Sequence, residues 1–306
     1  MSEPRRVAAV ADGGADGDRT VDGLVRAMAA VLGATLGGDA VPEARALLAA
    51  LHAQPRHWPS VARETVLAPT DWTAGLAAAR RRAAGAPAQY ATGVAAFRQL
   101  TLAVDERVLI PRPETELLVE LVLEATRGTP GGDVVDVGTG SGAIALALAS
   151  EGAFARVIAT DLSVDALRVA EANAARCAAL LRAPVEFRQG SLLAPVPERL
   201  VRAVVSNPPY IAHGEADALP RLVRDWEPAV ALFSGAHGMA LTERLLVEAA
   251  EVLAPGGMLA LEVDARRARL VAGRVAAHGA YTEVRVELDL TGRERFVVAR
   301  RGGVQA

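Results

Sequence analysis

The spacing of apolar residues along the chain changes near residue 87 and divides the sequence into two regions. In the first, apolar side chains recur three and four positions apart in the segments 21–34, 41–53 and 71–86. This spacing aligns apolar side chains on one face of an α-helix, so residues 21–86 are predicted to form a small helical domain. Residues 1–20 contain only a five-residue apolar run before glycines and acidic residues, and we expect a disordered tail there.

Residues 87–110 alternate apolar and polar side chains, which predicts a short β-hairpin, with a turn near Asp105, that links the two regions. Beyond residue 110, segments with helical spacing alternate with short apolar runs typical of buried strands. The expected helices are 115–128, 143–152, 164–181 and 242–257, and the expected strands are 133–138, 155–161, 185–190, 202–209, 258–264, 281–290 and 293–300. This alternation predicts an α/β fold, with a mostly parallel sheet covered on both faces and an antiparallel hairpin at one edge.

Composition excludes several classes of protein. The 306 residues are 51% hydrophobic and 23% charged, which predicts a globular chain of about two domains. No run of 18 or more apolar residues occurs and the N-terminus lacks a signal-peptide core, so we expect a cytoplasmic protein without a membrane span. Cys177 is the single cysteine, which excludes an intramolecular disulfide, and no Cys/His cluster offers a metal site. The net charge of −3 and the absence of lysine argue against a Schiff-base enzyme, a Walker-type phosphate site and a dedicated nucleic-acid binder.

A glycine-rich turn follows the first predicted strand of the α/β region and opens directly into a helix. Glycines allow the backbone to turn sharply and to approach a ligand, while free N–H groups lie at the start of the helix. The turn comprises Gly138, Thr139, Gly140, Ser141 and Gly142, and Asp136 precedes it. Its pattern predicts a site for a nucleotide-containing cofactor and is shared with NAD enzymes.

Asp161 ends the next predicted strand, where a carboxylate can accept hydrogen bonds from both hydroxyls of a ribose. The alternative role for Asp161 is the N-cap of the following helix. Enzymes that use NAD and enzymes that use S-adenosylmethionine share this ribose contact. Asp136 favours the second class, because a carboxylate before the glycines suits the amino-acid end of S-adenosylmethionine.

A third motif, Asn207-Pro208-Pro209-Tyr210, follows the fourth predicted strand of the sheet, at the edge where open α/β sheets bind ligands. The prolines fix φ and remove N–H donors, so that nearby carbonyls stay available as acceptors. The side-chain oxygen of Asn207 and the carbonyl of Pro208 could hold the two hydrogens of a planar –NH2 group, while Tyr210 packs on its face. Holding both hydrogens orients the nitrogen lone pair toward a methyl carbon.

These three motifs resemble those of class I S-adenosylmethionine-dependent amino methyltransferases. Within that group, the segment RVLIPRPETELLVE (107–120) resembles the release-factor glutamine methyltransferases. The resemblance implies a methyltransferase domain of Rossmann-like fold at 111–306 and a substrate-docking role for the helical domain at 21–86. It also implies methyl transfer from S-adenosylmethionine to N5 of the glutamine in the GGQ motif of class I peptide chain release factors.

The resemblance also implies residue roles. Gly138–Gly142, with Asp136, would wrap the cofactor and Asp161 would hold its ribose. Asn207–Tyr210 would clamp the glutamine amide, with Asn207, Pro208 and Tyr210 as the catalytic residues and Asn207 also touching the cofactor. Ser191 and Leu192 stand where the family often has an acidic residue and an aromatic one near the adenine, and Glu262-Val263-Asp264 replaces Glu-Ile-Gly. These departures bear on cofactor affinity.

Three alternatives stay open at this stage. An amino methyltransferase that acts on a nucleic-acid base would also bind a planar –NH2 group, although a basic face or a target-recognition domain is not evident. A ribosomal-protein glutamine is a second substrate of the same chemistry, and a non-catalytic cofactor-binding homologue is the third alternative. Arg112 and Glu114 are expected to take structural or cofactor-lining roles, or to bridge the domains, and His213 is a weak candidate for a base. We expect a monomer that binds neither nucleic acid nor membranes directly.

Overall fold

The computed structural model describes residues 19–197, 200–235 and 237–303, and the chain divides into two compact units between Thr92 and Gly93. The division falls inside the segment 87–110 that the sequence assigns to a linking hairpin. Residues 88–92 are helical and belong to the first unit, whereas the hairpin itself belongs to the second. Most of the expected tail, 1–18, lies outside the described residues.

The first unit is built from helices, as its spacing predicts. Its elements are α1 (Val21–Leu36), η2 (Gly37–Asp39), α2 (Ala40–Leu51), α3 (Trp58–Val61), α4 (Pro69–Ala83) and α5 (Ala88–Thr92). Thr20 is structured rather than part of a tail, because its Oγ1 accepts a hydrogen bond from the backbone N–H of Gly23 (3.1 Å) and caps α1. Gly75 permits α4 to approach α1, since a Cβ there would lie 2.9 Å from a methyl of Leu24.

By length and composition alone, one segment of the described chain, Val21–Leu51, is apolar and long enough to cross a membrane. It comprises α1 and α2, which the three residues of η2 separate. The large apolar side chains Leu24, Met28 and Leu48 are fully buried within this unit. Core helices of this composition meet the same criterion, so the segment is weak evidence for a membrane span.

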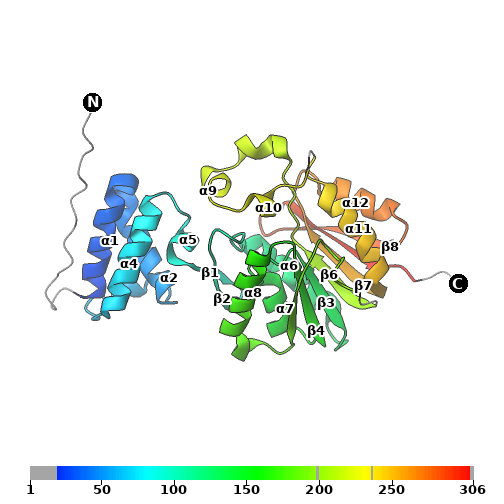
Figure 1. The fold of residues 1–306 in the computed structure, drawn as a ribbon, viewed down its shortest axis with the longest axis horizontal. Coiled ribbons are helices and arrows are strands. Elements are labelled where there is room, and N and C mark those ends of the chain that lie inside the picture. The colour runs from blue at the N-terminus through cyan, green and yellow to red at the C-terminus, as the bar shows by residue number, and fades with distance from the viewer. Residues whose placement is uncertain (1–18, 198–199, 236, 304–306) are drawn as a thin grey trace. The chain divides into compact units, whose positions relative to one another are not determined.

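The second unit is centred on a seven-stranded sheet in the order β5-β4-β3-β6-β7-β9-β8 (Figure 1). The strands are β3 (Asp133–Val137), β4 (Arg156–Asp161), β5 (Val185–Gln189), β6 (Val201–Ser206), β7 (Leu253–Glu262), β8 (Tyr281–Leu288) and β9 (Glu294–Arg301). The pairs from β5 to β7 are parallel, whereas β9 is antiparallel to both β7 and β8. The predicted α/β fold with an antiparallel edge hairpin is therefore confirmed.

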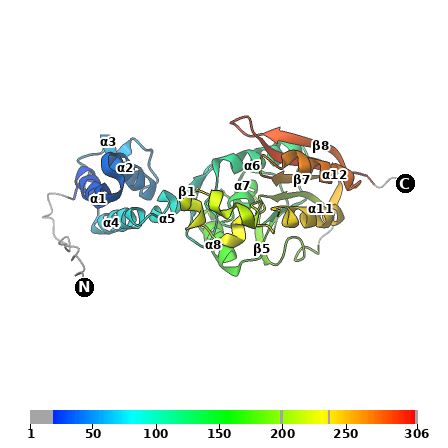
Figure 2. The ribbon, with the colours of Figure 1, turned by 90° about the horizontal axis from the view of Figure 1, so that it is seen from above.

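Helices cover both faces of this sheet because its central strands are apolar on both sides. Val134 of β3 packs in one core with α6 (Pro113–Thr126), α7 (Ala143–Glu151) and the end of α8 (Val164–Arg176). Its neighbour Val135 points to the opposite face and packs in a second core with α11 (Ala240–Val252) and α12 (Ala268–Ala277). Figure 2 shows the same sheet and its helices from above. The short elements η3 (Ala178–Leu180), η4 (His213–Ala218), α9 (Arg221–Arg224) and α10 (Ala229–Leu232) complete the unit.

Two local expectations are wrong. The hairpin of β1 (Val94–Phe97) and β2 (Leu100–Ala103) turns at Arg98-Gln99, not near Asp105. The guanidinium of Arg98 fixes this turn through hydrogen bonds to the carboxylates of Glu120 and Glu151, both on helices of the sheet domain. Such long-range contacts are not visible in the local alternation of the sequence.

The expected helix 242–257 is also shorter than predicted, because it ends at Val252 and β7 begins at Leu253. Leu253 pairs with Val201 of β6, and Pro255 cannot donate the hydrogen bond that would continue a helix. Gly256 adopts a φ of +75° within β7, where the pairing with β6 shifts register between Leu253 and Met258.

Candidate active site

Two cavities lie side by side where β3, β4 and β6 end, the edge at which open α/β sheets bind ligands. We call them the glycine-loop cavity, which Gly138, Gly140 and Asp161 line, and the clamp cavity, which Arg112 and Tyr210 line. The residues that line both are Leu109, Asn207, Pro208, Pro209 and Ala231. The Asn-Pro-Pro segment is therefore a wall common to the two cavities.

Backbone, not side chains, forms the glycine-rich wall. Gly138 and Gly140 adopt φ values of +75° and +55°, and an added Cβ at either position would meet nothing within 4 Å of the protein. Gly142 differs, because its Cβ would lie 3.2 Å from the Cβ of Ala170, so packing also disfavours a side chain there. Gly142 and the buried residues Thr139 and Ser141 do not line the cavity. Their roles toward a cofactor remain predictions.

Asp161 presents its carboxylate at the end of β4, on the wall of the glycine-loop cavity. Its Oδ2 accepts a hydrogen bond from the N–H of Gly140 (2.9 Å) and its Oδ1 from the N–H of Ser163 (2.9 Å). Burial raises the pKa of this carboxyl, and these backbone hydrogen bonds oppose the shift. The N-cap of α8 is Ser163, whose Oγ accepts a hydrogen bond from the N–H of Ala166, so the alternative role of Asp161 as the cap is wrong. The carboxylate keeps accepting capacity toward the cavity, which suits a diol.

Asp136 is fully buried beneath the glycine loop and does not line the cavity. Its Oδ2 accepts hydrogen bonds from the hydroxyl of Thr139 (2.7 Å) and the N–H of Ala145 (3.1 Å). Its Oδ1 has no partner among the described residues, which is costly for a buried acceptor. Burial raises the pKa of this carboxyl to about 7, against the hydrogen bond from Thr139. An unsatisfied acceptor of this kind suits a donor that a ligand would bring.

Ser191 and Leu192 follow β5 and line the far part of the glycine-loop cavity. The carbonyl of Leu192 accepts a hydrogen bond from the hydroxyl of Thr160 (3.0 Å), and Nη2 of Arg244 lies 3.5 Å from Oγ of Ser191. Most of the apolar lining belongs to no motif in the sequence, and only Leu162 had a usable signal, since it directly follows Asp161. The lining residues that sequence reasoning missed are Arg107, Val108, Leu109, Val137, Thr160, Leu162, Ser163, Ala166, Gly190, Ser206, Val230, Ala231 and Leu241.

Hydrogen bonds on both sides fix the Asn-Pro-Pro-Tyr segment. Before it, the hydroxyl of Ser206 donates to the carbonyl of Val137 (2.7 Å), which ties the end of β6 to the end of β3. After it, the N–H of Ile211 donates to the carbonyl of Leu232 (3.1 Å). Gly238 has a φ of +69°, and a Cβ there would lie 2.3 Å from the carbonyl oxygen of Tyr210. The segment is therefore held rigidly before any ligand arrives.

The side chains of this segment are in a partly desolvated setting. Burial raises the pKa of Tyr210 to about 12, with a further contribution from the charge of Glu262, so its phenol is neutral at physiological pH. Nδ2 of Asn207 donates to Oγ1 of Thr115 (3.3 Å), and that hydroxyl donates to Oε2 of Glu262 (2.7 Å). Burial raises the pKa of Glu262 to about 7, and the hydrogen bond from Thr115 opposes the shift.

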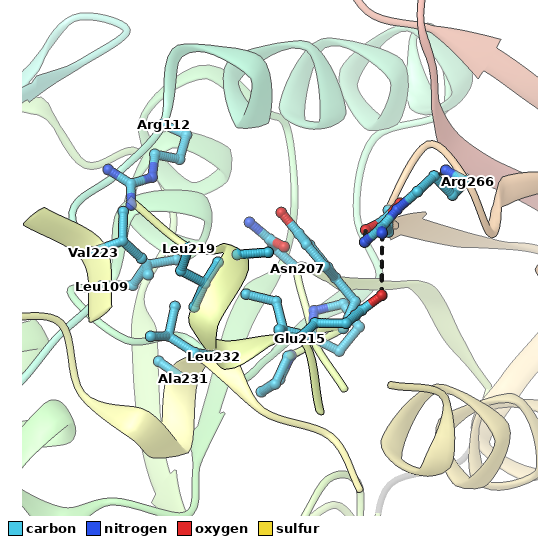
Figure 3. A pocket seen from close by; sticks show the side chains of 15 residues that line it. Leu109, Arg112, Asn207, Glu215, Leu219, Val223, Ala231, Leu232 and Arg266 are labelled. Carbon is cyan, nitrogen blue, oxygen red and sulfur yellow. Dashed lines mark hydrogen bonds and ion pairs between the residues drawn. The ribbon is translucent and has the colours of Figure 1, made fainter. Parts of the chain in front are cut away.

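The clamp cavity contains charges that are already paired. The guanidinium of Arg112 donates to both carboxylate oxygens of Glu227 (2.6 and 2.7 Å), and Arg266 forms an ion pair with Glu215 (3.1 Å), drawn as a dashed line in Figure 3. Since Glu227 belongs to the same unit as Arg112, the alternative of an interdomain bridge from Arg112 is wrong. His213 stacks on Phe233 at 5.4 Å and lines neither cavity, which removes it as a base.

Comparisons with known proteins agree on one chemistry. A family model described as "Methyltransferase small domain" matches residues 113–227. The chain is 46% identical to a release factor glutamine methyltransferase of Deinococcus radiodurans, over 73% of this chain and 77% of that protein. It is 44% identical to a protein of the same name from Koribacter versatilis and 45% identical to one from Moorella thermoacetica. Each of these alignments covers 72% of this chain and 77% of the other protein.

Solved structures support the fold alone. A methyltransferase from Pyrococcus furiosus aligns with a TM-score of 0.51 and 20% identity, and covers 68% of this chain and 92% of that one. The hMettl16 catalytic domain, solved in complex with a 3'UTR hairpin, aligns with a TM-score of 0.54 and 13% identity. This alignment covers 83% of this chain and 92% of that one. The second similarity covers more of this chain than the second unit contains, so it extends beyond the α/β sheet domain.

Proposed function

The chain belongs to the family of release factor glutamine methyltransferases, and from this premise we propose that it methylates N5 of the glutamine in the GGQ motif of class I peptide chain release factors. The observation that supports this substrate most directly is the wall that Asn207, Pro208 and Pro209 form between the two cavities. A methyl donor in one cavity and a glutamine side chain in the other would meet at this wall.

The residues of the glycine-loop cavity fit S-adenosylmethionine. Gly138 and Gly140 leave the wall free of side chains and the carboxylate of Asp161 can accept from ribose hydroxyls, while beneath this wall Oδ1 of the buried Asp136 lacks a donor. Ser191 and Leu192 line the end that we assign to the adenine. When bound, S-adenosylmethionine supplies an electrophilic methyl group.

The chain's own residues then act mainly by orientation. An amide nitrogen is a weak nucleophile, because its lone pair is delocalised into the carbonyl. Oδ1 of Asn207 and the carbonyl of Pro208 accept its two hydrogens, and the ring of Tyr210 packs on the planar group. These contacts fix the direction of attack and stabilise the positive charge that develops on nitrogen. Proton loss from that nitrogen to water completes the transfer.

We also propose that the helical unit docks the release factor and that the enzyme acts as a cytoplasmic monomer without direct nucleic-acid contacts. The residues that line the two cavities all belong to the second unit, which leaves the surface of the first unit for docking. Its exposed apolar side chains Val61 and Val66 offer contact surface.

The test is mass spectrometry of a release factor incubated with the enzyme and S-adenosylmethionine. The expected result is the mass of one methyl group on the GGQ glutamine, and a factor with alanine at that position is the matched control. If the cofactor binds but the factor gains no mass, the proposed substrate is wrong. Ribosomal protein and nucleic acid would then be tested with the same readout.

A further inference from the structure

A buried chain of hydrogen bonds leads from Asn207 to two side chains that line neither cavity. Thr115 lies in the first turn of α6 and is 5% exposed, and Glu262 lies near the end of β7 and is 2% exposed. The contacts run from Nδ2 of Asn207 to Oγ1 of Thr115 (3.3 Å) and from that hydroxyl to Oε2 of Glu262 (2.7 Å). Residues 115, 207 and 262 are far apart in sequence, so only the fold brings them together.

We propose that Thr115 and Glu262 are positioning residues that fix which end of the Asn207 amide faces the substrate. This role rests on the proposed transfer to a glutamine amide. The two ends of an asparagine amide are almost equal in shape, but one is a donor and the other an acceptor. A substrate –NH2 group requires the acceptor end.

The hydroxyl of Thr115 determines which end of the Asn207 amide faces the substrate, because it carries a single proton. That proton is donated to the carboxylate of Glu262, so the oxygen of Thr115 can only accept from Asn207. Nδ2 of Asn207 must then face Thr115, and no described residue donates to Oδ1. The acceptor end is thus left for the substrate.

Protonation of Glu262 would reverse the orientation of the Asn207 amide. A neutral carboxyl can donate to Thr115, whose own proton is then available to Asn207, and the amide would be held with Nδ2 toward the substrate. Burial raises the pKa of Glu262 to about 7. The charged and titratable groups that face it are Arg295 on β9, Glu114 and Arg112 at the start of α6, and Tyr210 after β6. Of these, the two arginines favour the ionised form and Glu114 opposes it.

The first test compares Thr115→Val with Thr115→Ser. Valine keeps the shape and removes the hydroxyl, so we expect kcat for release-factor methylation to fall about 10- to 100-fold, with an unchanged Kd for S-adenosylmethionine. Serine restores the hydroxyl and should restore most of kcat. Thr126→Val is the matched control, since Thr126 is a buried threonine of the same helix whose hydroxyl bonds to the carbonyl of Val122 (2.7 Å). Its kcat should equal that of the wild type.

The second test is the pH profile of Glu262→Gln, which retains an acceptor for Thr115 but does not titrate. When both enzymes are measured on the same release factor, wild-type kcat should rise as the pH passes through about 7. The pH profile of the variant should lack this rising limb. A Thr115→Val enzyme as active as Thr126→Val, a Thr115→Ser enzyme as impaired as Thr115→Val, or an unchanged limb in Glu262→Gln would each overturn the positioning role. A wild-type enzyme that binds the cofactor but leaves the factor unmethylated would instead overturn the proposed function.

Discussion

The two cavities share a wall but are built in different ways. The glycine-loop cavity takes one wall from Gly138 and Gly140, where the backbone itself is the surface, and the rest of its lining from segments between Arg107 and Leu241. The clamp cavity takes side chains from segments far apart in sequence, from Leu109 and Arg112 to Asp264 and Arg266. A wall made of local backbone is visible in the sequence as a motif, whereas a lining made of distant side chains exists only after folding.

The cavities also differ in how their charges are satisfied. Burial raises the pKa of both acids at the glycine loop, Asp136 and Asp161, and Oδ1 of Asp136 has no donor among the described residues. In the clamp cavity Arg112 is paired with Glu227, and Arg266 with Asp264. An unsatisfied acceptor thus lies beneath the wall of the first cavity, while the second uses its charges to hold its own shape.

The largest expected effect concerns the wall that the cavities share. Asn207→Ala removes the acceptor for the substrate amide, so the rate of methyl transfer should fall about 100- to 1,000-fold. The Kd for S-adenosylmethionine should change less than about threefold, because only one of many contacts is lost. Single-turnover methylation and calorimetric titration measure the two quantities. A variant that loses cofactor binding but keeps its turnover per bound enzyme would show that Asn207 belongs to the first cavity alone.

A second prediction separates the glycines that form the wall from those that only pack. Gly138→Ala and Gly142→Ala both force alanine into a left-handed conformation, at a cost of about 1–2 kcal/mol of stability. Only Gly138 lines the cavity, so only Gly138→Ala should raise the Kd for S-adenosylmethionine, by about tenfold for the loss of a close approach. Gly142→Ala should have the lower Tm, because its Cβ meets Ala170 and Leu146. Equal Kd values for the two variants would contradict the backbone-built wall.

The third prediction concerns the unsatisfied acid. Asp136→Asn keeps the acceptor for Thr139 and Ala145 but replaces the unpartnered oxygen with a donor. The Kd for S-adenosylmethionine should rise about tenfold if Oδ1 accepts a charged donor from it. An unchanged Kd would leave Asp136 as a support for the loop only.

Asp136→Asn should also change how the free energy of unfolding depends on pH. The folded pKa of Asp136, about 7, lies above its unfolded value of 3.8, so the folded state retains the proton and wild-type stability declines as pH rises between these values. The free energy of unfolding of Asp136→Asn, relative to that of wild type, should therefore rise by on the order of 3 kcal/mol between pH 4 and pH 8. Denaturant unfolding at the two pH values measures this gain.

The smallest expected effect lies at the adenine end. Ser191→Asp places a carboxylate where the neutral hydroxyl now lies, 3.5 Å from Nη2 of Arg244. A charged acceptor bonds an amino group more strongly than a hydroxyl does, so the Kd for S-adenosylmethionine should fall about threefold to tenfold. Titration of the variant against wild type checks this, with Ser191→Ala as the control. Weaker binding by Ser191→Asp would show that the adenine amino group is not near this position.

Much of the fold could be predicted from the sequence because its signals are local. The strand that ends at Asp136-Val137 and the strand that ends at Asp161 are short apolar runs, and the helices between them show their spacing directly. The turn at Arg98-Gln99 could not be predicted, since the carboxylates that hold Arg98 lie 22 and 53 residues away. Local alternation contains no information on such partners.

The sequence by itself determined the α/β sheet, the glycine loop, the carboxylate at the end of β4 and the Asn-Pro-Pro-Tyr segment, because each depends on residues next to one another in the chain. The tertiary structure alone decided that Asn207 lies between two cavities, that Thr115 and Glu262 stand behind it, and that Arg112 pairs with Glu227. The physical reason is that hydrogen bonds and ion pairs act over a few ångströms, whereas their partners here lie 92, 147 and 115 residues apart along the chain. Folding of the sheet supplies that proximity.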